Sequence, residues 1–486
     1  MSSNNEFKKR SRLMKPLAIL AALIPMVGVT QELTWHSDYR STAKLLINDQ
    51  QPLIAKAPTA SDEAQVRSYL SANAEQFGLH PELKYLSLVT IKPSLLANHY
   101  HFQQQIQGTA VDKAEIVVSV ANSDNSIIRV YNSTHPISQV AEASVVEQLS
   151  KAHISASDAL SKVWAYQPAK SKLLTEPGVR QVAINENGEF RLVYQVTMVV
   201  NELKGSWEYT LDVQKGEVIK LKRLNAPYKG AFSGPTAEQI LNKGLAKQNI
   251  KRTSISYNKA FQEYRDKQAK STVQVEGGAE ADAIAKTAST GSAQVFDPDP
   301  RTTLNDADLH PTSPDSAFSA AYFTRTLQDI TLSDFGIYSL EGPWISIVDW
   351  DEPSTAPSTT LDGNWTELRG NLAFYDAMTY FHIDQNQRYL QSLGFVGDKL
   401  IQGDGITADT NGVDEEDNAF FEPGANRLTF GSPVGCASNA EDADVILHEY
   451  GHALQDSIVM NWGGGDTGAI GEGFSDYWGA HTVMAL

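Results

Sequence analysis

Two histidines four positions apart, followed 20 positions later by a glutamate, most restrict how the C-terminal part of this 486-residue chain can fold. His448 and His452 would share one face of an α-helix, because residues i and i+4 lie one above the other on that face. The glycine run 463–465 then interrupts the helix, and enough chain follows for a second helix to return beside the first. Glu472 would lie on that returning helix. The spacing therefore predicts two packed helices that bring three metal-ligand side chains together.

Two further carboxylates complete a pattern that is typical of zinc chemistry. Glu449 directly follows the first histidine, and Asp476 lies one helical turn after Glu472. Two imidazoles at this spacing can reach one zinc ion, and a carboxylate that is not a ligand can act as a general base. Another carboxylate can hold a ligand histidine through its second ring nitrogen. We therefore predict that His448, His452 and Glu472 bind Zn²⁺. Glu449 is the predicted catalytic base, and Asp476 is predicted to orient His448.

Local signals indicate helices in this region. Ser438 and Glu441 fit a capping box, in which a serine and a glutamate satisfy backbone N–H groups at the start of a helix. A longer amphipathic helix is expected from about residue 371 to 393, where apolar residues recur at helical spacing.

The single cysteine and the net charge exclude several classes of function. With only Cys436, the chain cannot form an intrachain disulfide or a cysteine-based zinc knuckle. A net charge of −18 makes nucleic acid an unsuitable partner, because phosphate binding requires a basic surface. We therefore predict no nucleic-acid partner.

The N-terminus has the features of an export signal. Five basic residues between positions 8 and 15 precede a 13-residue apolar run at 17–29. This run fits a signal peptide and is too short for an ordinary membrane span, with an uncleaved anchor or a buried helix as alternatives. We predict a signal peptide at 1–30 and a secreted, extracellular protein, with the periplasm as the alternative compartment. No stable membrane insertion is expected after the signal is removed.

Hydrophobic periodicity divides the rest of the chain into small modules. Helical spacing followed by alternating strands occurs twice, with helices at 62–77 and 155–164. Helices beside antiparallel strands predict an α+β fold. Residues 277–292 are rich in Ala, Gly, Ser and Thr, which is typical of an exposed linker. The predicted domains are 31–135, 136–225, a linker or activation region at 226–292, and 293–486.

Charge divides the chain as well. Residues 271–486 contain 34 acidic and 7 basic residues, a net charge of −27, whereas residues 1–270 carry +9. Of that +9, +4 lies in the first thirty residues. Oppositely charged segments attract each other, so we predict that the N-terminal part binds the C-terminal part. Composition that differs between independent domains is the alternative.

With these motifs in view, the sequence resembles the thermolysin-like gluzincins, and most of all the fungalysin-type zinc metallopeptidases. The resemblance rests on HEYGH at 448–452 and GEGFSD at 471–476. NAFF at 418–421 is similar to the edge strand that pairs with the substrate backbone in these peptidases. That similarity implies substrate contacts for Asn418 and Ala419, with an ordinary strand as the alternative.

The N-terminal half resembles the propeptides of the same family. HYHFQQQ at 99–105 matches the fungalysin/thermolysin propeptide motif, although Ala110 and Lys113 replace its usual proline and glycine. WEYTLD at 207–212 is similar to a second, PepSY-like propeptide module. The resemblance implies that the propeptide is an intramolecular inhibitor and chaperone.

The resemblance also implies a fold and an activity. The expected fold is α+β: propeptide modules of helices on antiparallel sheets, then a zincin-type catalytic domain with a β-rich lobe and active-site helices. The family's C-terminal helical lobe, with its oxyanion-stabilising histidine, is expected beyond Leu486. The implied function is a secreted zinc metalloendopeptidase precursor that hydrolyses protein or peptide substrates with zinc-activated water. A zinc-binding, non-catalytic or inhibitory module is the alternative.

Calcium is a second candidate cation. Asp444 matches a calcium-ligand position of the family. The loop 409–414 resembles a calcium-binding loop, but it lacks the glutamate that an EF-hand requires, so an ordinary polar turn is the alternative.

Overall fold

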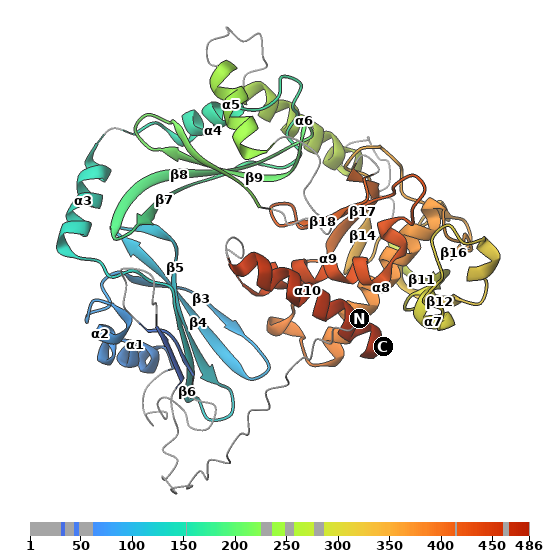
Figure 1. The fold of residues 1–486 in the computed structure, drawn as a ribbon, viewed down its shortest axis with the longest axis horizontal. Helices are drawn as coiled ribbons and strands as arrows, with labels where there is room; N and C mark the ends of the chain where they lie inside the picture. Colours follow the sequence, from blue (N-terminus) through green and yellow to red (C-terminus); the bar gives the residue numbers. More distant parts are fainter. Residues whose placement is uncertain are drawn as a thin grey trace, which may run out of the picture.

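The fold is a mixture of helices and strands, which confirms the α+β prediction (Figure 1). The computed structural model describes residues 31–34, 43–47, 62–151, 153–224, 236–247, 257–276, 286–413, 416–459 and 466–485. The predicted signal peptide at 1–30 lies outside the described residues. Among the helices of the described part, none has the length and apolar character needed to cross a bilayer.

The first N-terminal module packs two short helices against one face of an antiparallel sheet. Its helices are α1 (Asp62–Ala72) and α2 (Ala74–Phe77). Its strands are β1 (Gln31–Thr34), β2 (Ala43–Ile47), β3 (Leu86–Pro93), β4 (Ala97–Ile106), β5 (Thr109–Ala121) and β6 (Ile127–Asn132). Fully buried Leu70, Phe77 and Phe102 join the helices to the sheet. Strands β4, β5 and β6 confirm the alternating strands that the sequence predicts after the first helical segment.

The second module continues the same sheet. Strand β5 pairs with β7 in a parallel bridge, so one ten-stranded sheet extends across the predicted boundary at residue 135. The strands of this module are β7 (Gly178–Glu186), β8 (Glu189–Val200), β9 (Leu203–Asp212) and β10 (Val218–Arg223). Its helices are α3 (Gln139–Ser150), α4 (Ala156–Trp164), α5 (Ala237–Lys247) and α6 (Tyr257–Glu276).

Helices α5 and α6 fall within the region expected to be a linker. They contribute Ile240, Tyr257 and Ala260 to the core of the second module. Strand β11 (Lys286–Phe296) also begins before residue 292, because it pairs along its length with β12 (Tyr322–Ser333). Residues 286–292 are thus part of a sheet, and residues 277–285 of the predicted linker lie outside the described residues.

Within residues 286–413, 416–459 and 466–485, the C-terminal half has two small sheets and four α-helices. One sheet has the order β15-β13-β12-β11-β16 and the other β14-β17-β19-β18. The short strands are β13 (Tyr338–Ser339), β14 (Ile345–Ile347), β15 (Thr359–Thr360), β16 (Asn364–Trp365), β17 (Ile406–Gly412), β18 (Ala419–Glu422) and β19 (Arg427–Gly431). The helices are α7 (Pro300–Leu304), α8 (Leu372–Ser392), α9 (Ala443–Ile458) and α10 (Asp466–Ala485).

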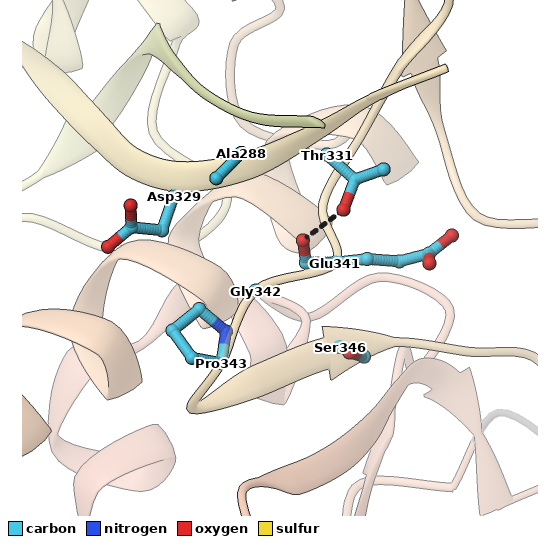
Figure 2. Close-up of a pocket in the computed structure, with 7 residues that line it drawn as sticks. All are labelled: Ala288, Asp329, Thr331, Glu341, Gly342, Pro343 and Ser346. Atoms are coloured by element: carbon cyan, nitrogen blue, oxygen red, sulfur yellow. Dashed lines mark hydrogen bonds between the residues drawn. The ribbon is translucent and has the colours of Figure 1, made fainter. Parts of the chain in front are cut away.

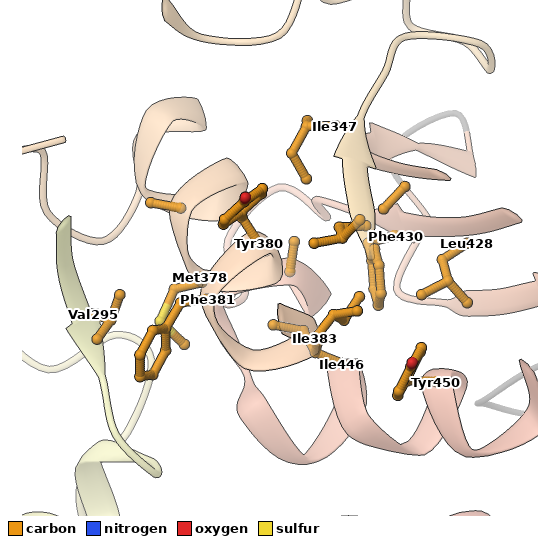
Figure 3. Close-up of a cluster of buried hydrophobic side chains, with 14 of the residues drawn as sticks. Val295, Ile347, Met378, Tyr380, Phe381, Ile383, Leu428, Phe430, Ile446 and Tyr450 are labelled. Carbon is orange, nitrogen blue, oxygen red and sulfur yellow. The ribbon is translucent and has the colours of Figure 1, made fainter. Parts of the chain in front are cut away.

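Helix α8 forms the centre of this half. Its bounds agree with the helix predicted from about 371 to 393, and Asn371 caps it by accepting a hydrogen bond from the N–H of Ala373. Its side chains are buried on almost every face, and they pack with residues of both sheets and of α9 (Figure 3). Met378, Tyr380 and Ile383 of α8 belong to the same core cluster as Phe430 and Ile446. This core supports the two helices that follow.

The N-terminal half curves around α9 and α10 in Figure 1, and its contacts with the C-terminal half include hydrogen bonds from Lys92 and Ser206. Lys92 of β3 donates hydrogen bonds to the carbonyls of Ser457 and Ile458, at 3.2 and 2.9 Å, at the end of α9. Ser206 of β9 donates to Glu422 Oε1 of β18 at 2.8 Å. The two halves therefore meet at the elements that surround the candidate site.

Candidate metal centre

Helix α9 places the histidine pair. Asp442 caps it, because its side chain accepts hydrogen bonds from the N–H groups of Asp444 and Val445. The predicted capping box was wrong: Ser438 instead caps the 3₁₀ turn η4 (Asn439–Glu441), which precedes the helix. The apolar side of α9 is buried through Val445, Ile446, Leu447, Tyr450, Ala453 and Leu454. Burial of this side fixes the direction in which the histidines point.

The structure brings the three predicted ligands together. The potential ligand atoms of His448, His452 and Glu472 all lie within 4.8 Å of one another. Glu472 Oε2 is 3.2 Å from His448 Nε2, and Glu472 Oε1 is 3.6 Å from His452 Nε2. Among the described residues, this is the one group of three or more His, Cys, Asp or Glu side chains that converges in this way. The donor set is the His₂Glu combination that suits zinc.

Close packing of α9 on α10 brings Glu472 within reach of the histidines. A Cβ atom on Gly451 would lie only 2.9 Å from the Cα and Oγ atoms of Ser475. A Cβ on Gly479 would lie 3.3 Å from the carbonyl oxygen of Asp444. Residues without side chains therefore allow the two backbones to approach at both points. Close packing of the two helices therefore explains why a glycine stands at position 451.

Asp476 contacts the histidine that the sequence assigned to it. Its Oδ1 lies 2.8 Å from His448 Nδ1. Burial opposes the charged imidazole, but Glu472, Glu449 and Asp476 together raise the pKa of His448. Burial also opposes the charged form of Glu472, yet hydrogen bonds from His448 and His452 lower the pKa of Glu472 to about 2. The cluster therefore holds its carboxylate ionised and its first histidine in a fixed orientation.

Glu449 lies beside the cluster and is not part of it. Its side chain is fully buried, and neither carboxylate oxygen makes a hydrogen bond of good geometry to the described residues, although the backbone N–H of Phe421 approaches it. Burial raises the pKa of Glu449 to about 7, although His452 and His448 oppose the shift. A buried carboxylate with unsatisfied oxygens is costly unless a proton or a cation compensates it. This unsatisfied pair of oxygens fits a site that is completed by a cation and a water molecule.

Strand β18 carries the predicted substrate-contact residues. It is one of the two edge strands of its sheet in the described part of the chain, and there it pairs with β19 alone. The carbonyl of Asn418 accepts a hydrogen bond from the N–H of Gly431, so Asn418 and Gly431 form a hydrogen-bonded pair of the antiparallel ladder. Hydrogen-bonded and non-hydrogen-bonded pairs alternate, so the next pair, Ala419 with Phe430, is not hydrogen-bonded. By this alternation, Ala419 and Phe421 direct their backbone groups away from β19. The N–H of Phe421 faces Glu449, where it opposes the rise in that pKa.

Asn418 differs from Ala419 in its environment. It is 3% exposed, and its Oδ1 accepts a hydrogen bond from the N–H of Ala419. Asn439 donates to its carbonyl. The side chain of Asn418 therefore fixes the start of the strand. Sequence reasoning did not single out Phe421, although strand alternation from Ala419 could have identified it.

The calcium candidates do not form a convergent cluster in the described residues. Asp409 is buried and accepts hydrogen bonds from the N–H groups of Trp350, Asp351 and Asn411. Burial raises the pKa of Asp444 to about 6, and the nearby carboxylates of Asp442 and Asp299 add to the shift. Residue 414, at the end of the predicted loop, lies outside the described residues.

A separate pocket of about 530 Å³ lies between β11, β12 and β14 (Figure 2). It is lined by Ala288, Asp329, Thr331, Glu341, Gly342, Pro343 and Ser346. Thr331 donates a hydrogen bond to the carbonyl of Glu341 across it. None of the candidate ligands lines this pocket, so its position does not coincide with the candidate metal centre.

Comparisons with known proteins do not identify a family for this chain. No protein-family model and no curated protein matches it. Among solved structures, the C-terminal domain of YpeB from Bacillus megaterium matches at 10% sequence identity and a TM-score of 0.18. The match covers 37% of this chain and 71% of that chain. Similarity at this level carries no information about the function of this chain.

Proposed function

We propose that this protein is a zinc-dependent peptide hydrolase whose N-terminal half regulates the half that carries the metal centre. The observation that carries the proposal is the convergence of His448, His452 and Glu472 beside a buried Glu449 that stays outside the ligand set. A closed structural zinc site would gain nothing from an additional buried carboxylate, whereas a hydrolytic site requires a base.

The chemistry divides among the side chains according to their positions. A zinc ion held by the three ligands would polarise a water molecule and the carbonyl of a peptide bond. Glu449 would accept a proton from that water and pass it to the departing amide nitrogen. A pKa raised toward neutrality suits both transfers. Asp476 would accept a hydrogen bond from the Nδ1–H of His448. The unprotonated Nε2 of His448 would then be the atom that binds the zinc ion.

The proposed substrate is a peptide in an extended conformation. Strand β18 supports this choice because Ala419 and Phe421 direct backbone groups away from the sheet. An extended peptide can add to such an edge through main-chain hydrogen bonds. The N–H of Phe421 faces Glu449, so a peptide on this edge would lie beside the proposed base.

The proposed regulatory partner is the N-terminal half of the same chain. Ser206 contacts Glu422, the last residue of β18, and Lys92 contacts the last turn of α9. Arg223 also lies near enough to Glu416 for opposite charges to attract. These contacts support an inhibitory and chaperone role for the N-terminal half, and the difference in net charge between the two parts acts in the same direction. Export through residues 1–30 is part of the same proposal.

Metal analysis of the full chain tests the metal centre. The wild-type protein should retain one zinc ion after dialysis, and the variants His448→Ala and Glu472→Ala should lose it. His310→Ala is a suitable control, because His310 is exposed and contacts Thr312 rather than the cluster. Stoichiometric zinc in both ligand variants would rule out this assignment.

Hydrolysis of an unfolded protein substrate tests the reaction. It should require zinc, stop with a chelator, and fall by about 10²–10⁴-fold in Glu449→Gln, which should keep the metal. Because the N-terminal half is proposed to inhibit, the assay is repeated after proteolysis in the predicted activation region, residues 226–292. A protein that binds zinc but never hydrolyses peptides would support the non-catalytic alternative.

A further inference from the structure

Two adjacent carboxamide side chains lie in the middle of α8, beneath both helices of the candidate metal centre. Asn386 and Gln387 are 0% exposed, within a core that is otherwise largely apolar. Successive residues of a helix point about 100° apart, so neighbouring side chains can contact two different elements. Here one contacts α9 and the other contacts α10.

Gln387 binds helix α9 at the proposed catalytic motif. The hydroxyl of Tyr450 donates a hydrogen bond to Gln387 Oε1 at 2.7 Å. Gln387 Nε2 donates to the carbonyl of Ile401 at 2.9 Å. Tyr450 is fully buried, and it stands between Glu449 and Gly451 in the chain. The hydrogen bond therefore fixes how α9 is rotated about its axis, and how far it is shifted along that axis, relative to α8. It does so at the residue next to the proposed base.

Asn386 binds helix α10 through two residues one turn apart. The indole Nε1 of Trp478 donates to Asn386 Oδ1 at 3.2 Å, and Asn386 Nδ2 donates to Thr482 Oγ1 at 3.1 Å. Thr482 Oγ1 donates in turn to the carbonyl of Trp478 at 2.8 Å. An indole N–H can only donate, which determines how the carboxamide is oriented. Trp478 lies two residues after Asp476 on the helix that carries Glu472.

Buried hydrogen bonds specify a helix arrangement more sharply than apolar contacts do. If α9 or α10 slid or rotated relative to α8, a buried donor or acceptor would lose its partner, and an unsatisfied buried polar group is costly. Apolar side chains tolerate such shifts with less change in energy. The packing of Gly451 against Ser475 sets the separation of α9 and α10, but it does not attach either helix to α8.

We infer that Asn386 and Gln387 are positioning residues that hold α9 and α10 in the register at which His448, His452 and Glu472 converge. The inference rests on the proposed function, because it concerns the geometry of the proposed zinc site. Neither residue touches the ligand cluster; each acts through the helix that it binds.

Zinc affinity and coordination geometry test this role in the full chain. The variants are Gln387→Met and Asn386→Leu, which preserve approximate volume and remove the hydrogen bonds. Thr379→Val is the matched control, since Thr379 is also fully buried on α8 and its Oγ1 has no hydrogen-bond partner among the described residues. Affinity is measured by competition with a chromophoric chelator. Geometry is measured from the visible absorption spectrum of the cobalt-substituted protein.

We expect both variants to bind zinc at least ten-fold more weakly and to shift the cobalt spectrum, as outer residues of metal sites commonly do. Thr379→Val should match the wild type in both measurements. Affinities within two-fold of the wild type, with an unshifted cobalt spectrum, would overturn the inference.

A paired substitution separates positioning from general stability. Tyr450→Phe combined with Gln387→Met removes both members of the Tyr450–Gln387 hydrogen bond and leaves only the carbonyl of Ile401 without its donor, so the double variant should be more stable to heat than Gln387→Met alone. We expect its zinc affinity to remain low. Affinity that recovers together with stability would show that the pair only stabilises the fold. If the wild-type protein itself binds no zinc, the proposed function fails, and the inference fails with it.

Discussion

His448 Nδ1 lies 2.8 Å from Asp476 Oδ1, so a residue on α10 fixes the ring of a histidine on α9. Glu472, the third member of the cluster, lies one turn before Asp476 on the same helix. One helix therefore supplies both a ligand candidate and the group that orients another ligand candidate. Any movement of α10 would change two features of the site at once.

Asp476→Ala should weaken zinc binding by about 10–100-fold, because His448 would lose the partner that fixes its tautomer and orientation. The fold should be unaffected, since the side chain of Asp476 is 74% exposed. Chelator competition measures the affinity. Asp398→Ala, at an exposed carboxylate on the turn η2 (Gly397–Lys399), should leave it unchanged. Equal zinc affinities for Asp476→Ala and Asp398→Ala would show that Asp476 does not orient His448.

Glu449→Gln should change how the stability of the metal-free protein depends on pH. Burial raises the pKa of Glu449 from 4.5 to about 7, so the folded state holds this proton more tightly than the unfolded state. The wild-type protein then loses stability as the pH rises from 4.5 to 7, and the loss is complete above 7. Glutamine does not titrate there. The free energy of unfolding of the variant minus that of the wild type should therefore rise by about 3 kcal/mol between pH 4 and pH 8.

Urea unfolding with a chelator present measures this difference. Reporting the variant minus the wild type cancels the titration of the groups that do not interact with Glu449, which leaves Glu449 and its neighbours His448, His452 and Glu472. A difference that stays constant across the pH range would show that Glu449 ionises normally in the folded protein.

Gly451→Ala should destabilise the protein by about 1–3 kcal/mol and weaken zinc binding, because the new Cβ would overlap the backbone of Ser475. Gly473→Ala is the matched control on α10, where a Cβ would meet nothing within 4 Å. That control should be neutral or more stable by up to about 1 kcal/mol, since alanine favours helix. Thermal unfolding and zinc competition are measured for both. If Gly451→Ala changed neither the thermal stability nor the zinc affinity, the close packing of α9 on α10 at this position would not be required.

Lys92→Met should lower the stability of the full chain by about 1–3 kcal/mol, because the carbonyls of Ser457 and Ile458 would lose a charged donor. Hydrogen exchange should speed up in the last turn of α9. Lys84→Met is the control, because Lys84 is exposed and pairs with Glu142 within the N-terminal half. An equal response of α9 to both variants would show that Lys92 does not join the two halves.

Helical periodicity was enough to predict the two helices of the candidate site. The i, i+4 histidines required α9, and the spacing to Glu472 required a returning helix, which is α10. The strand at 418–421 was expected from its similarity to the edge strand of a known family, and β18 covers Ala419–Glu422. These features depend on short-range patterns, which a single sequence contains.

Features that depend on a distant partner were not predictable. Residues 286–292 appear as a polar linker in sequence, but β12 supplies the hydrogen bonds that make them a strand. Ser438 and Asp442 are both good caps, and local rules cannot distinguish the 3₁₀ turn that one begins from the helix that the other begins. The bond between Gln387 and Tyr450 joins residues 63 positions apart, and neither has a sequence signal that points to the other.

The contacts of Lys92 with Ile458 and of Ser206 with Glu422 span 366 and 216 positions, respectively. Contacts of such long range form slowly in folding, whereas neighbouring strands within each half pair early. During synthesis the N-terminal half emerges first, so its sheet can be complete before α9 leaves the ribosome. The last turn of α9 would then meet the ammonium group of Lys92 on a preformed surface. We expect the interface to close as the final step of folding, and its loss to slow refolding of the C-terminal half more than that of the N-terminal half.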